Sequence, residues 1–275
     1  VALLFTDISV VFSTRRNMPA EVPTWLPGVI LNLYLIALYY YYKLKIDRDD
    51  QLNFLDLLWR VFATGLVATV ISLVLRLIEY LLGATTLTGN IVYIEVTYLI
   101  NLGLMTSFLL AAFNAWKRLI LYQKSKWLLR LWAIFEYALL ISLLYNSYIF
   151  PRVEWLYLTL FWSFVAVGLV LSSNLKWVAF LNFRQKWTSL LLLLLTIFYL
   201  GYSFYTNNSL VFTVSGETVG FVDHRGHVFI QSLMVFVTVY SSFAFLVIFF
   251  NLPTTSVFEQ KLEEVVNFQR ISQSI

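Results

Sequence analysis

Seven runs of roughly 20 apolar residues constrain most strongly how this chain can fold. Each run is about as long as a helix that crosses the hydrocarbon core of a bilayer, whereas strands of membrane barrels alternate apolar and polar residues. Only 12% of the 275 residues are charged, about half the share of a soluble domain. The chain is therefore predicted to be an all-α integral membrane protein. The seven predicted spans cover residues 25–42, 53–82, 91–116, 128–149, 155–172, 187–205 and 228–250.

Basic residues outside the spans are concentrated on one side of this predicted bundle. Thirteen lysines and arginines fall in one set of connections and in the C-terminal stretch, against four in the opposite set. Cytoplasmic loops of membrane proteins carry the excess of Lys and Arg. This rule places the N-terminal stretch outside and the C-terminal segment in the cytoplasm, as in a multi-pass protein of a bacterial inner membrane.

Three segments follow from this topology. Residues 1–24 form an outer segment, 25–250 a seven-helix transmembrane domain, and 251–275 a cytoplasmic linker helix. The apolar stretch at 1–12 is too short to span, and both a truncated span and an interfacial helix fit it. The largest outer connection, 206–227, is predicted to be hairpin-like, because "SLVFTV" and "TVGFVDH" flank a Gly-containing turn.

Ionisable residues within the spans are functional candidates by default, because charge is costly inside a membrane. Arg76 and Glu79 lie near the outer end of the second span, and Glu95 lies at similar depth at the start of the third. The three could fasten the two spans together or form the polar floor of an outward-facing ligand pocket. Glu136 is the deepest carboxylate, about 12 Å from the inner surface. Hydrogen bonding between helices and a proton-linked or ligand-contacting role both fit Glu136.

Both histidines of the chain lie at the end of the outer connection, beside an aspartate, as Asp223, His224 and His227. Histidine titrates near neutrality and binds metals. Two histidines and one aspartate without a fourth ligand are not a metal motif. No metal site is therefore predicted, and this segment is expected to be a solvated loop that caps the bundle.

Missing residues exclude several chemistries. The chain has no cysteine, which removes thiol catalysis and iron–sulfur clusters. No histidine lies inside a predicted span, which removes bis-histidine haem and Ser–His catalysis there. No Walker loop, HExxH motif or Rossmann glycine run occurs. We expect no cofactor, no catalytic residue and no nucleic-acid partner, since the net charge of +4 reflects the positive-inside bias.

The stretch that follows the last span is predicted to be a separate amphipathic helix. Pro253 is expected to end the span, and Ser256 with Glu259 forms a capping box that starts a new helix. So short a helix is marginal in water without a partner or a continuation. A helix lying on the membrane surface is the alternative, although its acidic residues suit an anionic surface poorly. Its apolar face has roughly the heptad spacing of a coiled coil and comprises Phe258, Leu262, Val265, Phe268 and Ile275.

The sequence "LPTTSVFEQKLEEVVNFQRISQSI" at 252–275 resembles the linker that joins multi-span membrane regions to cytoplasmic signalling domains in sensor proteins of Bacteroidota. The resemblance implies an output domain after the linker, either a GAF-type domain with a SpoIIE-type serine/threonine phosphatase or a histidine kinase. It also implies that this segment is a sensor input module. We expect the C-terminal helix to form a homodimer or to contact other membrane subunits. The alternatives are a non-catalytic membrane subunit that docks to other membrane subunits, and a small-solute transporter.

Overall fold

The computed structural model describes residues 2–15, 23, 25–47, 53–83, 91–123, 125–145, 154–217 and 227–272. These residues form eight α-helices and one short 3-10 helix, with no strand among them. The predicted all-helical bundle is therefore confirmed. In chain order the elements are α1 (Ala2–Arg15), α2 (Leu26–Asp47), α3 (Phe54–Leu82), α4 (Ile91–Ile120), α5 (Lys126–Tyr145), α6 (Glu154–Ser172), η1 (Lys176–Phe180), α7 (Phe183–Glu217) and α8 (Val228–Ser272).

Six of the described helices, α3 to α8, are long and apolar enough to cross a membrane. The chain therefore has the helices of a membrane-embedded protein. Helix α2 coincides with the first predicted span but is not among these six. Its second half is less apolar, because four consecutive tyrosines are followed by Lys43 and Lys45.

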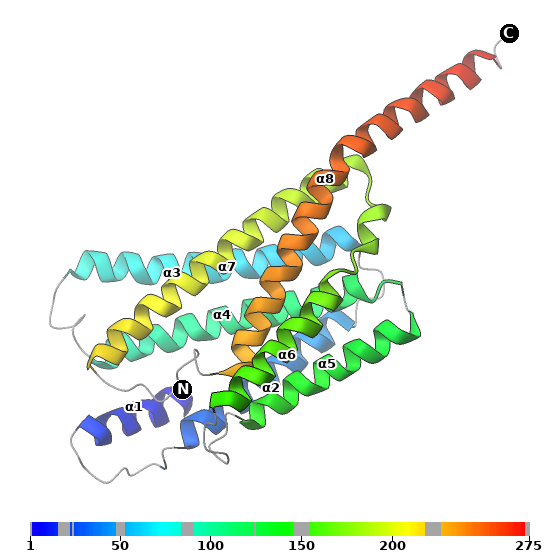
Figure 1. Cartoon of the computed structure of the whole chain (residues 1–275). Coiled ribbons are helices and arrows are strands. Elements are labelled where there is room, and N and C mark those ends of the chain that lie inside the picture. The colour runs from blue at the N-terminus through cyan, green and yellow to red at the C-terminus, as the bar shows by residue number, and fades with distance from the viewer. Residues whose placement is uncertain are drawn as a thin grey trace.

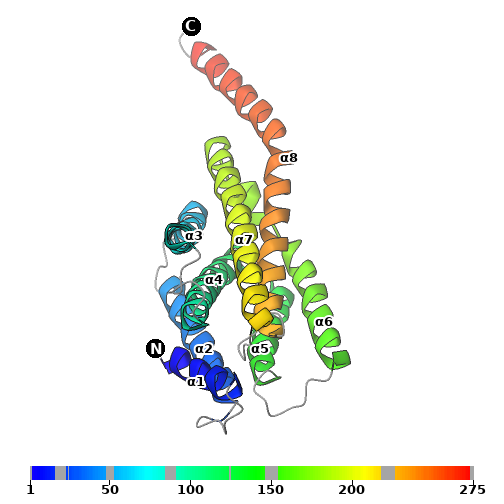
Figure 2. The ribbon, with the colours of Figure 1, turned by 90° about the vertical axis from the view of Figure 1, so that its left-hand side faces the viewer.

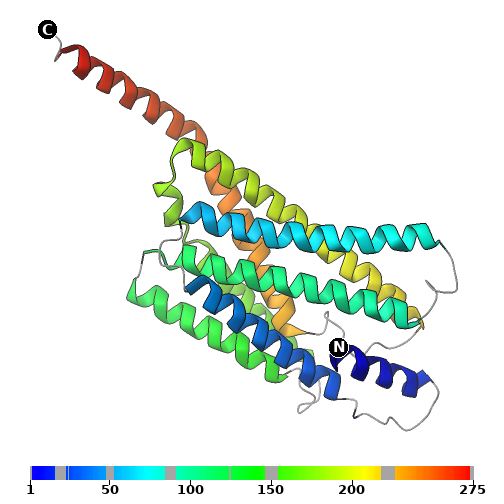
Figure 3. The same cartoon turned by 180° about the vertical axis from the view of Figure 1, so that it is seen from behind.

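Helices α4 and α8 lie at the centre of the bundle. Helix α4 packs against α1, α2, α3, α7 and α8, and α8 packs against α4, α5, α6, α7 and η1 (Figures 1 and 3). Helix α1 lies at one end of the bundle, against α2 and α4, and the last part of α8 projects beyond the opposite end (Figure 1). The projecting part of α8 therefore continues a helix that packs at the centre of the bundle.

Aromatic rings fasten the first half of α8 to its neighbours. Phe236 contacts the rings of Phe113 on α4 and of Trp132 on α5, with centroids 5.6 and 5.8 Å apart. One turn later, Tyr240 packs on Trp116 and accepts a hydrogen bond of 2.9 Å from the indole Nε1 of Trp177 in η1. Phe236 and Tyr240 thus join α8 to three other elements.

Helix α3 lies at the side of the bundle and approaches α4 and α7 closely at Gly65. A Cβ atom built on Gly65 would lie 2.6 Å from Cδ2 of Tyr199 and 2.9 Å from Cε2 of Phe108. No side chain fits there without a shift of these rings. The missing side chain at Gly65 therefore sets how closely α3 packs against the bundle.

The hairpin predicted at 206–227 is wrong over residues 206–217, which continue α7 as a helix to Glu217. No glycine or proline interrupts the chain between Tyr202 and Ser215, so the helix of the preceding span can extend through the valine- and threonine-rich stretch. Context overrides the strand preference of such residues. The rest of the predicted hairpin, 218–226, lies outside the described residues.

The predicted helix end at Pro253 and new start at Ser256 are also wrong, because α8 runs without interruption from Val228 to Ser272. A proline inside a helix removes one hydrogen bond and crowds the preceding turn, which bends the helix without having to end it. Figure 2 shows a change of direction in α8 where its colour turns from orange to red.

Candidate functional site

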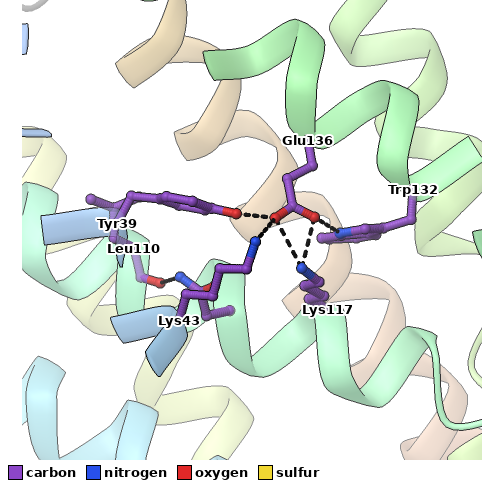
Figure 4. Close-up of polar contacts among 7 residues, drawn as sticks. Tyr39, Lys43, Leu110, Lys117, Trp132 and Glu136 are labelled. Atoms are coloured by element: carbon purple, nitrogen blue, oxygen red, sulfur yellow. Dashed lines mark hydrogen bonds and ion pairs between the residues drawn. The ribbon is translucent and has the colours of Figure 1, made fainter. Parts of the chain in front are cut away.

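Side chains from three helices meet around the carboxylate of Glu136 on α5 (Figure 4). Lys117 of α4 lies 2.7 Å from its Oε2 atom, and Lys43 of α2 lies 3.1 Å from its Oε1 atom. The hydroxyl of Tyr39 donates to Oε1, and the indole Nε1 of Trp132 donates to Oε2 at 2.8 Å. The side chain of Glu136 is only 8% exposed, so this carboxylate is both buried and fully hydrogen-bonded.

Helical spacing explains how this Glu136 network forms. Tyr39 and Lys43 are four residues apart on α2, as are Trp132 and Glu136 on α5, so each pair lies on one helical face. Two ammonium groups surround one carboxylate, which leaves a net charge of +1. Sequence reasoning identified Glu136 but missed its four partners. The spacing of four was the available signal, although it cannot tell which helices pack together.

Arg76 and Glu79 of α3 line a groove of about 510 Å³ between α3, α4 and α7. The guanidinium of Arg76 lies over the rings of Tyr202 and Tyr205, at 5.7 and 5.2 Å, and 3.4 Å from the hydroxyl of Ser209. Among the described residues Arg76 makes no ion pair, and Glu79 is exposed. The structure thus places these two predicted site residues together on the wall of one groove.

Glu95 does not join Arg76 and Glu79. It is 2% exposed and faces Asp7 of α1, which is fully buried. Burial raises the pKa of Asp7 to about 9, and the neighbouring carboxyl of Glu95 adds to this increase. Asp7 was missed from the sequence, although it is the one acidic residue in the apolar stretch 1–12. The two buried carboxyl groups lie where α1 packs against α4.

His227 is buried, so the expectation of a solvated loop is wrong for this residue. Its Nε2 atom lies 3.1 Å from Oδ1 of Asn32, and Nδ2 of Asn32 donates to the carbonyl of Leu143 at 2.9 Å. These bonds join the start of α8 to α2 and α5. Asp223 and His224 lie outside the described residues. Within the described ranges no three His, Asp or Glu side chains are grouped so that they could hold a metal ion.

All residues predicted for the signalling helix belong to α8, in its projecting half. They are Pro253, Ser256, Phe258, Glu259, Leu262, Val265 and Phe268.

Fold and contacts together define a helical membrane protein whose spans are joined by buried polar side chains. The chain matches no protein-family model, no curated protein and no solved structure.

Proposed function

We propose that this chain is the membrane-embedded input module of a signalling protein, which passes a stimulus from the membrane or periplasm to a cytoplasmic output domain. The observation that supports this most is the continuity of α8. This helix has 45 residues, whereas about 20 suffice to cross a membrane. Its first half belongs to the core of the bundle, and its second half leaves it.

The contacts of α8 support a relay role. Trp132 donates to Glu136 and also packs against Phe236 of α8. A change in the Glu136 network can therefore reach α8 through a single contact, between the rings of Trp132 and Phe236. The bond between His227 and Asn32 offers a second route, at the start of α8. Coupling of this kind needs an element with two arrangements that both sites affect.

The proposal includes a topology. Helix α2 crosses the membrane in addition to α3 to α8, which makes seven spans in all. The N-terminal stretch lies outside, and the projecting half of α8 lies in the cytoplasm of a bacterial cell, at its inner membrane. The distribution of basic residues supports this orientation. Two copies would pair through the apolar face that includes Leu262 and Val265.

Insertions into α8 test the relay. Each added residue turns the following helix by about 100°, and seven residues return nearly to the original phase. We expect one to three alanines between Phe258 and Lys261 to shift the output activity of the complete protein to a constant high or low value. Seven residues inserted there should restore its response. The matched control is the same series after Gln123, in the connection between α4 and α5, which should leave the response unchanged.

An output that ignores the length of the insert in α8 would refute the relay. The embedded-subunit alternative would then be favoured, with the projecting helix as a docking segment. Affinity purification of the complete protein from its own membrane, followed by identification of co-purified subunits, would test that alternative directly.

A further inference from the structure

We propose that the groove between α3, α4 and α7 binds a phospholipid with a phosphoethanolamine headgroup. The proposal goes beyond the signalling function and does not depend on it. The groove has a volume of about 510 Å³ and is lined by residues of α3, α4 and α7. Its polar lining includes Arg76, Glu79, Thr97, Asn101, Thr206 and Ser209.

Two opposite charges face this groove without neutralising each other. Arg76 is held by the rings of Tyr202 and Tyr205 and by the hydroxyl of Ser209, and it has no ion-pair partner in the described part of the chain. Glu79, one turn further along α3, makes no side-chain hydrogen bond or ion pair with a described residue. A ligand that carries both an anion and a cation would satisfy both residues at once.

The chemistry of the lining selects the headgroup. Guanidinium groups bind phosphate with charge-assisted hydrogen bonds, which suits Arg76 to the phosphate of a lipid. A primary ammonium can donate hydrogen bonds to the Glu79 carboxylate, which the trimethylammonium of phosphatidylcholine cannot do. Phosphatidylglycerol has no cation for Glu79. Phosphoethanolamine therefore matches both residues best.

The position of the groove favours a lipid over a soluble zwitterion. Arg76 lies six residues before the end of α3, about 9 Å along the helix, which is the depth of a headgroup and its first acyl carbons. The outer face of α3 beside it is exposed and apolar, with Leu73, Leu77 and Leu81 between 49 and 73% exposed. Acyl chains can lie along this face while the headgroup enters the groove.

Native mass spectrometry tests the proposal. The purified protein is released from nanodiscs that contain equal amounts of phosphatidylethanolamine, phosphatidylglycerol and phosphatidylcholine, and the retained lipids are counted. We expect phosphatidylethanolamine to be retained about tenfold more than either competitor. Arg76→Gln should lower retention of phosphatidylethanolamine about tenfold, because the phosphate loses its charged partner. The matched control, Arg130→Gln, changes an exposed arginine on α5 and should leave retention unchanged.

Glu79→Gln gives the sharpest outcome, since Glu79 makes no described contact on which folding depends. Its retention of phosphatidylethanolamine should fall to that of phosphatidylglycerol. This variant decides the question even where Arg76→Gln fails to fold. Equal retention of the three lipids by the unaltered protein, or an unchanged preference in Glu79→Gln, would overturn the proposal. Binding of free phosphoethanolamine without any retained lipid would overturn the assignment to a lipid.

Discussion

Replacing Glu136 with glutamine tests whether the Glu136 network stabilises the bundle. The substitution keeps the size of the side chain and removes its charge. Lys43 and Lys117 then lose the carboxylate that both of them contact, at 3.1 and 2.7 Å. Two neighbouring ammonium groups remain between the helices without a counter-charge.

The expected loss of unfolding free energy is about 3 kcal/mol. Removing one partner of a buried ion pair costs about 3–5 kcal/mol, because an uncompensated charge is left behind. The lower end applies here, since the side chains of Lys43 and Lys117 are 31 and 20% exposed and can turn partly toward water. The glutamine can also keep a hydrogen bond to the indole of Trp132, which lies 2.8 Å from Oε2 of Glu136.

Equilibrium unfolding in mixed detergent micelles, followed by tryptophan fluorescence, measures this loss. Lys117→Met in the Glu136→Gln background should recover about 2 kcal/mol of it, because one unpaired charge is then removed. Lys126→Met, at an exposed lysine at the start of α5, is the control and should change stability by less than about 0.5 kcal/mol. Strictly additive losses for Glu136→Gln and Lys117→Met would refute the argument, since residues that interact must be coupled.

Three further results are expected. Gly65→Ala should destabilise the protein by about 1–3 kcal/mol, because the added Cβ would overlap the rings of Tyr199 and Phe108. Gly201→Ala is the control and should not destabilise it, because no atom lies within 4 Å of a Cβ at that position. Equilibrium unfolding in the same micelles compares the two variants. The docking of α1 should be strongest below about pH 4 and be lost as the pH rises through about 9, because the pKa of Asp7 is raised in the folded state. Hydrogen-exchange protection of α1, corrected for the intrinsic rate, should show this loss. In the Asp7→Asn variant the protection of α1 should no longer change with pH. Cysteines placed at Thr86 and Ser125 should react with an impermeant thiol reagent from opposite sides of the membrane, and labelling of both from outside would refute the orientation.

The positions of the helices could be predicted from the sequence because membrane thickness imposes a length on every apolar run. Glu136 could be identified for a similar reason, since a carboxylate so far inside a span needs partners. Its lysine partners could not be predicted. Long side chains of Lys43 and Lys117 reach between helices, and only the packing of α2, α4 and α5 shows that they converge.

Sequence signals of a helix boundary gave wrong predictions where the preceding helix continues past them. Pro253 and the capping box at Ser256 are valid signals of a helix boundary, yet α8 passes through both, because a proline can bend a helix without ending it. The depth of Glu95 alone predicts that it lies beside Arg76. Depth does not tell which side of a helix faces which neighbour, and Glu95 faces α1.

The hydrogen bond between Trp177 and Tyr240 divides α8 into unequal arms. Twelve residues separate Val228 from Tyr240, about 18 Å, and 32 residues separate Tyr240 from Ser272, about 48 Å. If all of α8, including its bend, tilts as one rigid body about this point, its far end moves up to about 2.7 times as far as its near end. On this condition, a shift of about 1 Å where His227 meets Asn32 would displace Ser272 by up to about 3 Å.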